Sequence, residues 1–184
     1  MTSTKQRIME SLLKLLDERP LSRISVKDIV EDCGINRNTF YYHFEDMPAL
    51  VEAVALEEVK QVMARYDDVS SLEQCYEAAM RLSLDHKRAV YHIYNSANRE
   101  MLERNLMEIC GYVVTKYIDG AIAGRPIRPE DRRIIIHSYQ CECFGHVIDW
   151  LNHGMSDDVE RQFIRLCQLR RGSTEIMLER AVIV

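Results

Sequence analysis

Residues 24–44 read ISVKDIVEDCGINRNTFYYHF, and this stretch decides the fold of the first third of the chain. Ser25 followed three residues later by Asp28 is typical of a capping box at the start of a short helix. Gly34 can take the left-handed conformation that ends a helix, and Asn36 is a good cap for the next one. The spacing therefore predicts two short helices joined by a tight turn, which is a helix-turn-helix.

The second of these helices has two different faces. Phe40 and Phe44 can pack onto the other helices, which leaves four polar side chains free to project outward: Arg37, Asn38, Thr39 and Tyr42. Arginine pairs with guanine, asparagine with adenine and a threonine methyl with the thymine methyl, at about 1–3 kcal/mol for each good pair. Tyr41, Tyr42 and His43 can donate hydrogen bonds to phosphates without adding fixed charge. The pattern is typical of a helix that reads double-stranded DNA.

The whole chain of 184 residues is predicted to be all-α. It holds seven Gly and four Pro, fewer than the many turns of an all-β fold need. Apolar residues recur at helical spacing from the N-terminus to the end, which predicts about nine helices. The last three are expected at residues 100–121, 129–152 and 157–180. We expect a helix-turn-helix domain over residues 1–47 and an effector-binding and dimerisation domain over residues 48–184.

Composition limits the classes of protein that fit. The net charge is −5, and residues 1–50 hold seven Lys/Arg against eight Asp/Glu, so DNA binding must rest on local arrangement rather than on bulk charge. The N-terminus has no signal-peptide pattern, and no window is apolar enough for a membrane span. We therefore expect a cytoplasmic protein that makes no membrane contact, with its six scattered Cys reduced.

The helix-turn-helix resembles the DNA-binding domain of TetR-family transcriptional regulators. The family signature reads here as Ser25-Val26-Lys27-Asp28-Ile29, Cys33-Gly34-Ile35 and Thr39-Phe40-Tyr41-Tyr42-His43-Phe44, within a match over about residues 5–56. The resemblance implies that Ser25 caps its helix and touches a phosphate, and that Lys27 approaches the operator. It also implies that residues 37–39 face bases and residues 41–43 contact the backbone. The predicted DNA-binding residues are Ser25, Lys27, Asn36, Arg37, Asn38, Thr39, Tyr41, Tyr42 and His43.

Two positions depart from the family pattern. The family usually has Lys three residues after the final Phe of the motif, where it meets a phosphate, and this chain has Met47. The frequent Gly or Pro near the start of the recognition helix is Asn38 here. These departures affect which operator is read.

The last two thirds of the chain is similar to the effector and dimerisation domain of short TetR-family members, such as the regulator of bacterial dihydroxyacetone kinase genes. This resemblance implies that the regulatory signal is a small-molecule effector or a protein partner. Residues of the kinds that line ligand pockets gather in three helical segments of this region. The predicted effector pocket comprises Tyr91, Tyr94, Asn95, Met107, Cys110, Tyr112, Tyr139, Cys143, His146 and Trp150.

The His and Cys residues of the second half allow other interpretations. Cys143 and His146 share a helix face, but two ligands do not make a zinc site, so we predict no metal. Tyr139, Cys143, His146 and Trp150 can equally form a packed stripe along one helix. Gly145 and Gly172, both expected within helices, favour close helix approach in a homodimer formed through the last two helices, although a simple bend also explains them.

The sequence contains no catalytic motif: no phosphate-binding loop, no nucleophile elbow and no His-Glu-x-x-His. We therefore expect no enzymatic activity and no cofactor. The function that fits best is an effector-responsive repressor that binds a palindromic operator as a dimer. The alternative is a helical interaction protein or co-regulator that acts through a protein partner, with weak or no DNA binding of its own.

Overall fold

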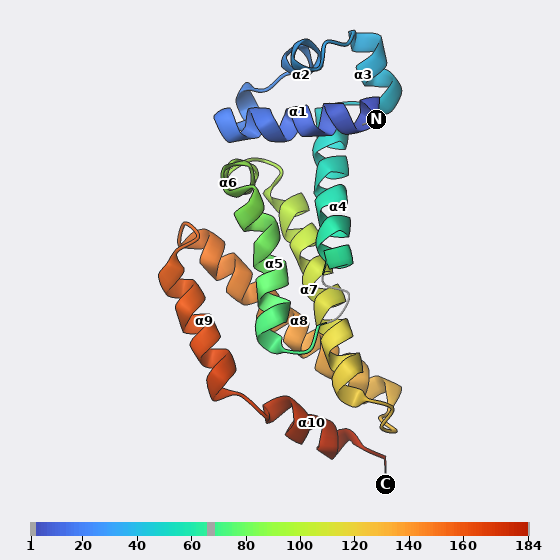
Figure 1. Cartoon of the computed structure of the whole chain (residues 1–184), viewed down its shortest axis with the longest axis vertical. Coiled ribbons are helices and arrows are strands. Elements are labelled where there is room, and N and C mark those ends of the chain that lie inside the picture. Colours follow the sequence, from blue (N-terminus) through green and yellow to red (C-terminus); the bar gives the residue numbers. More distant parts are fainter. Residues whose placement is uncertain (1–2, 66–68, 184) are drawn as a thin grey trace. The chain divides into compact units, whose positions relative to one another are not determined.

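The computed structural model describes residues 3–65 and 69–183, and its regular structure is helical (Figure 1). The helices are α1 (Thr4–Glu18), α2 (Val26–Cys33), α3 (Arg37–His43), α4 (Met47–Arg65), α5 (Leu72–Asp85), α6 (Lys87–Tyr94), α7 (Arg99–Ile122), α8 (Pro129–Asn152), α9 (Asp157–Leu169) and α10 (Ser173–Ala181), with a 3-10 turn, η1, at Leu21–Arg23. The prediction of an all-α fold is confirmed. In the described part of the chain, β-pairing is limited to one antiparallel bridge between Ile127 and Val182.

Polar side chains fix where the first helices begin. The Ser3 hydroxyl accepts from the Gln6 amide at 3.2 Å at the start of α1. The Asp46 carboxylate accepts from the Ala49 amide at 2.8 Å at the start of α4. These bonds satisfy amides that have no partner within their own helix.

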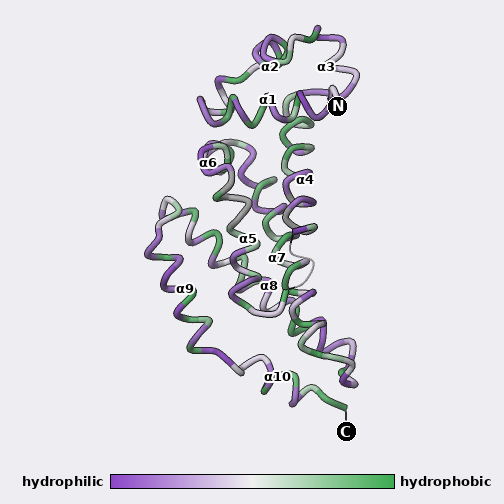
Figure 2. The backbone as a smooth tube through the Cα atoms, viewed as in Figure 1, coloured by the Kyte–Doolittle hydropathy of each residue, from purple (hydrophilic) through white to green (hydrophobic). Residues whose placement is uncertain are grey.

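The chain divides into two compact units. The first comprises Met1–Lys60 and Leu82–Asn105. Its core consists of apolar residues from α1 to α4, among them Ile8, Leu12, Leu16, Ile29, Phe40 and Leu50, all fully buried. Hydrophobic and hydrophilic residues alternate along α1 (Figure 2), because one face of this helix packs inward and the other meets solvent.

Helix α6 belongs to the first unit and contacts α1 directly. The Nδ1 atom of His92 lies 2.7 Å from the Leu16 carbonyl oxygen, near the end of α1. At the start of α6, His86 lies 3.5 Å from the Glu58 carboxylate on α4. The end of the predicted first domain, at residue 47, stays a prediction.

The second unit comprises Gln61–Arg81 and Leu106–Val184. Its core combines α5, α7, α8 and α9, and the Tyr76 and Phe163 rings stack within it at 3.6 Å. The Gln140 side-chain amide donates to the Met107 carbonyl at 3.0 Å, and Arg132 pairs with both oxygens of Asp119. These bonds join α8 to α7. Among the described residues, no helix has the length and apolar character that crossing a membrane requires.

The last predicted helix is divided in two. Gly172 has a φ of +85°, which interrupts the helix expected over residues 157–180 and separates α9 from α10. The placement of Gly172 inside a helix was therefore wrong, and the additional break gives ten α-helices in the described residues. Glycine adopts this left-handed conformation without the steric cost that a Cβ atom imposes. Gly145, in contrast, lies inside α8 as expected.

Candidate nucleic-acid interface

Ser25 and Asp28 form a complete capping box at the start of α2. The Ser25 hydroxyl accepts from the Asp28 amide at 3.4 Å, and the Asp28 carboxylate accepts from the Ser25 amide at 2.8 Å. The Ser25 hydroxyl also donates to the Asp28 carboxylate, and these bonds hold the pKa of Asp28 below its ordinary value. Because its proton is already used, the Ser25 hydroxyl can donate to a phosphate only by giving up its bond to Asp28.

The turn between α2 and α3 follows from two residues. Gly34 has φ +63° and ψ +38°, and the chain then reverses with the Ile35 amide donating to the Val30 carbonyl at 3.0 Å. Asn36 caps α3, because its side-chain oxygen accepts from the Thr39 amide at 2.8 Å and from the Thr39 hydroxyl at 3.0 Å. The turn and the cap together fix the direction of α3 relative to α2.

Helix α3 buries its aromatic face and exposes its polar one. Phe40 is 0% exposed, whereas Tyr42 is 85% exposed and both Arg37 and Asn38 lie at the surface. Tyr41 is half exposed, with its ring edge-on to Phe40 at 5.4 Å. His43 is half-buried, 5.0 Å from the Tyr42 ring. Arg37, Asn38 and Tyr42 therefore share an open surface, and Thr39 beside them is half-buried.

Helix α1 holds α2 in place through two cations. The Arg7 guanidinium donates to the Cys33 carbonyl at the end of α2, and Lys14 pairs with Asp32 at 2.5 Å. The hydrogen bond from Lys14 lowers the pKa of Asp32. We did not predict these positioning residues, although their spacing of seven places them on one face of α1.

Most acidic residues near α3 have local partners. Asp28, Asp32 and Asp46 are used in a capping box, an ion pair and a helix cap, respectively. Lys27, one of the predicted DNA contacts, is exposed and lies 3.7 Å from Glu31. These contacts reduce the repulsion that the acidic side chains would otherwise exert on DNA.

The predicted effector residues fall in both units. Tyr91, Tyr94 and Asn95 belong to the first unit, where Asn95 ends α6 and donates to the Tyr91 carbonyl at 2.9 Å. Tyr91 is half exposed and Tyr94 is buried, with the Arg99 guanidinium 4.2 Å from its ring centre. The other seven lie on α7 and α8 in the second unit.

The predicted stripe on α8 is largely buried within the second unit. Tyr139, Cys143 and Trp150 are buried, and His146 is half-buried with its ring 4.5 Å from Phe163. Burial lowers the pKa of the His146 imidazole. The Trp150 indole N–H has no hydrogen-bond partner in the described residues. A buried donor of this kind is available to a ligand oxygen.

The α7 residues of the predicted pocket differ in burial. Cys110 is buried, and a hydrogen bond between Cys110 and Cys143 raises the pKa of the Cys143 thiol. Met107 and Tyr112 are half-buried, and the Lys116 ammonium lies 5.5 Å from the Tyr112 ring. Across the described residues, no three His, Cys, Asp or Glu side chains form a group suited to a metal ion.

Comparison with protein families identifies the chain. Residues 8–54 match the family model described as "Bacterial regulatory proteins, tetR family". Residues 70–172, more than half of the chain, match the TetR model described as "Transcriptional regulator C-terminal region". The chain belongs to the TetR family of DNA-binding transcriptional regulators. The family predicted from the motif in residues 25–44 is confirmed.

Curated relatives of this TetR-family protein match over part of their length. The HTH-type transcriptional regulator UidR of Escherichia coli K12 is 30% identical over 63 residues, which cover 34% of this chain and 32% of UidR. The "Uncharacterized HTH-type transcriptional regulator YxbF" of Bacillus subtilis is 25% identical over 104 residues, 55% of this chain and 27% of YxbF. The match thus covers about a third or less of the length of these curated relatives.

Solved structures share the fold over nearly the whole TetR-family chain. The dihydroxyacetone kinase operon activator DhaS has a TM-score of 0.69 at 13% identity, covering 90% of this chain and 97% of DhaS. Salmonella enterica GusR has a TM-score of 0.59 at 15% identity, covering 96% and 95% of the two chains. A TetR-family regulator from Streptomyces coelicolor has a TM-score of 0.61 at 14% identity, covering 96% and 90%. The predicted likeness to dihydroxyacetone kinase regulators is confirmed as a likeness of fold.

The TetR-family interface has a distinctive residue where α4 begins. Met47 is the first residue of α4 and is half-buried, directly after the capping Asp46. Because the side chain is uncharged, this position supplies no cation for a DNA phosphate. The DNA-contact roles of the nine predicted residues stay predictions.

Proposed function

We propose that this protein is an effector-responsive repressor that binds a palindromic operator as a homodimer. The observation that carries the proposal is the division of α3 into a buried aromatic face and an exposed face bearing Arg37, Asn38 and Tyr42. Two such helices in successive major grooves, about 34–36 Å apart, would read two half-sites related by two-fold symmetry. A dimer seated there competes with other proteins for the same DNA in the cytoplasm.

An exposed face of α8 supports dimerisation through the last helices. Ser138, Cys141 and Gly145 are exposed, and their spacing places three small side chains on one side of α8. A Cβ atom added at Gly145 would meet nothing within 4 Å. Ile134 on α8 and Leu169 on α9 are large apolar residues that lie exposed, at 60% and 67%. A second copy of the chain would cover this surface, and small residues allow its helices to approach closely.

The effector role rests on the second unit. The unpartnered indole N–H of buried Trp150 supports a ligand that offers a hydrogen-bond acceptor, and the half-buried His146 can orient a polar end. Such an effector changes DNA affinity only if it binds the DNA-competent and the DNA-free states unequally. A protein partner that binds these two states unequally can change DNA affinity in the same way.

Selection from random duplex DNA tests the proposal. The purified full chain should enrich an inverted repeat, and a reporter gene carrying that repeat should be expressed more strongly when the regulator is deleted. Failure to enrich any sequence would overturn DNA reading and favour the co-regulator without DNA binding. Weaker reporter expression after deletion would make the protein an activator, as the name of DhaS says of that protein.

A further inference from the structure

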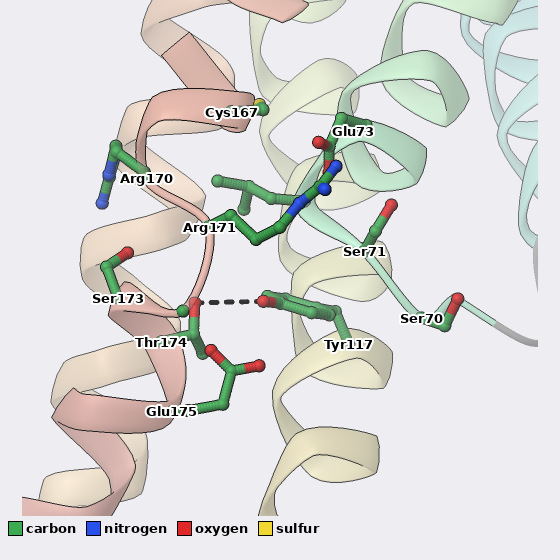
Figure 3. Close-up of a pocket in the computed structure, with 12 residues that line it drawn as sticks. Ser70, Ser71, Glu73, Tyr117, Cys167, Arg170, Arg171, Ser173, Thr174 and Glu175 are labelled. Carbon is green, nitrogen blue, oxygen red and sulfur yellow. Dashed lines mark hydrogen bonds between the residues drawn. The ribbon is translucent and has the colours of Figure 1, made fainter.

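A cleft in the second unit has no role in the function proposed above. It lies where the bend between α9 and α10 faces the first turn of α5 and the side of α7 (Figure 3). Its volume of about 410 Å³ is within the range of small-molecule sites, roughly 300–1,000 Å³. As far as the described residues go, its lining contains none of the ten predicted effector residues.

Two neighbouring arginines at the bend behave differently. Arg170 pairs with Glu142, and its guanidinium lies 5.5 Å from the centre of the Tyr139 ring. Arg171 extends across the cleft toward Glu73 (Figure 3), yet it makes no ion pair with any carboxylate of the described residues. An unpaired guanidinium in a cleft is suited to a carboxylate, which it can hold by two parallel hydrogen bonds.

A chain of three hydroxyl groups, two of which line the cleft, leaves one proton without a hydrogen-bond acceptor. Tyr117 donates to the Thr174 hydroxyl at 3.0 Å (Figure 3), and the Thr174 and Tyr139 hydroxyls lie 2.8 Å apart. Three hydroxyls have three protons, but the chain contains two hydrogen bonds. The remaining proton belongs to Thr174 or Tyr139, and both residues are more than nine-tenths buried. When Tyr139 donates its proton to Thr174, the hydroxyl proton of Thr174 has no acceptor. Thr174 lines the cleft, so this proton is available to a ligand.

The carboxylates that line the cleft indicate a positively charged group in its ligand. Glu73 and Glu175 also line it, and in the described structure neither forms an ion pair. Two guanidiniums, Arg170 and Arg171, line the cleft with these two carboxylates, but Arg170 is already paired with Glu142. Arg171 therefore stays available for a ligand carboxylate, and a simple anion would leave Glu73 and Glu175 without a positive partner. A ligand that carries both a carboxylate and an ammonium group matches all three side chains.

We propose that this cleft is a binding site for a small amino-acid-like zwitterion. The ligand carboxylate pairs with Arg171 and accepts the unmet hydroxyl proton at Thr174. Its ammonium group faces the Glu175 carboxylate. This binding requires no DNA, and of the predicted effector residues it involves Tyr139, through the hydrogen bond to Thr174. Its test is therefore separate from the test of the proposed repressor function.

The test titrates the full-length protein with each proteinogenic L-amino acid at millimolar concentration, measured by calorimetry and by the shift in Tm. At least one should bind. Its decarboxylated amine and its deaminated acid should each bind about tenfold more weakly or worse, because each lacks one charge-assisted contact. If no amino acid binds, or if either analogue binds as well as the parent, the proposal is overturned.

Matched variants locate the site. Arg171→Gln and Glu175→Gln should each weaken binding about tenfold or more. Arg180→Gln and Glu179→Gln remove the same charges from exposed positions of α10 outside the cleft and should bind like wild type. Unchanged affinity in Arg171→Gln would place the ligand elsewhere and contradict the proposal. Circular dichroism shows whether the variants fold. If a variant does not fold, the comparison of the amino acid with its amine and acid analogues on the wild-type protein tests the proposal.

Discussion

The side-chain oxygen of Asn36 accepts two hydrogen bonds from Thr39, one from its backbone amide at 2.8 Å and one from its hydroxyl at 3.0 Å. Both bonds fix the first turn of α3. They also occupy the acceptor of Asn36 and the donor of Thr39, which leaves the Thr39 methyl group for contact with a thymine methyl. Asn36 was predicted among the DNA-binding residues, and its geometry assigns it a structural role as the cap.

Substitutions at Asn36 separate capping from base reading. Asn36→Ser keeps a capping hydroxyl and should retain both stability and operator preference. Asn36→Ala removes the cap and should lower the free energy of unfolding by about 0.5–2 kcal/mol. Urea denaturation and operator titration measure the two effects. A loss of base preference in the stable Asn36→Ser variant would show that Asn36 itself contacts DNA.

Met47→Lys tests the missing cation at the start of α4. The added charge should tighten DNA binding and steepen the dependence of log affinity on log salt by up to about 0.9 per phosphate neutralised, hence nearly twice that for a dimer. Affinities measured over a series of salt concentrations give this slope, and Met47→Gln serves as the uncharged control. If the slope of the Lys variant equals that of wild type, residue 47 does not reach the DNA backbone.

A pair of glycine substitutions tests the dimer surface. Gly145 on α8 and Gly120 on α7 are both exposed, and a Cβ atom at either would meet nothing within 4 Å. Gly145→Glu should therefore fold but prevent dimerisation, because it places a charge in the proposed interface. Gly120→Glu is the matched control and should remain dimeric. Sedimentation measures the oligomeric state of both variants. If the Gly145→Glu protein is a dimer, this face of α8 is not the dimer interface.

The pKa of His146 predicts how stability changes with pH. Burial lowers this pKa in the folded protein, despite the opposing charges of Glu142 and Asp149, and Arg170 lowers it further. The unfolded chain therefore binds a proton more readily, so the stabilising contribution is complete above the ordinary histidine pKa of about 6.5 and is lost as the pH falls below it. His146→Phe keeps a ring but cannot titrate.

Urea denaturation between about pH 7 and pH 5 should show a smaller loss of stability for His146→Phe than for wild type. His137→Gln, which removes an exposed histidine from the same helix, should behave like wild type in this respect. An identical pH dependence in wild type and His146→Phe would mean that His146 is not the titrating group.

Local signals in the sequence were sufficient to predict the helix-turn-helix. Ser25, Gly34 and Asn36 act within three or four residues of their own positions, through capping bonds and a left-handed turn. The burial of Phe40 and Phe44 followed from their spacing on one helix. These features depend little on the rest of the molecule.

The bend at Gly172 depends on contacts that are distant in the sequence. The helical pattern of residues 157–180 continues through the glycine, and no proline marks a break. Thr174 is anchored by Tyr117 and Tyr139, which lie 57 and 35 residues away. The cleft beside this bend could not be predicted, because its walls exist only once α10 turns away from α9.

The reading of bases by α3 is tested most directly with Arg37→Ala, compared on the selected operator and on random duplex DNA. Because the Arg37 side chain is exposed, its removal should not disturb the packing of the core. We predict a loss of about 1–3 kcal/mol on the operator, relaxed preference at one position of each half-site, and a much smaller loss on random DNA. An equal loss on both DNAs would contradict the account, because it would reduce Arg37 to a phosphate contact.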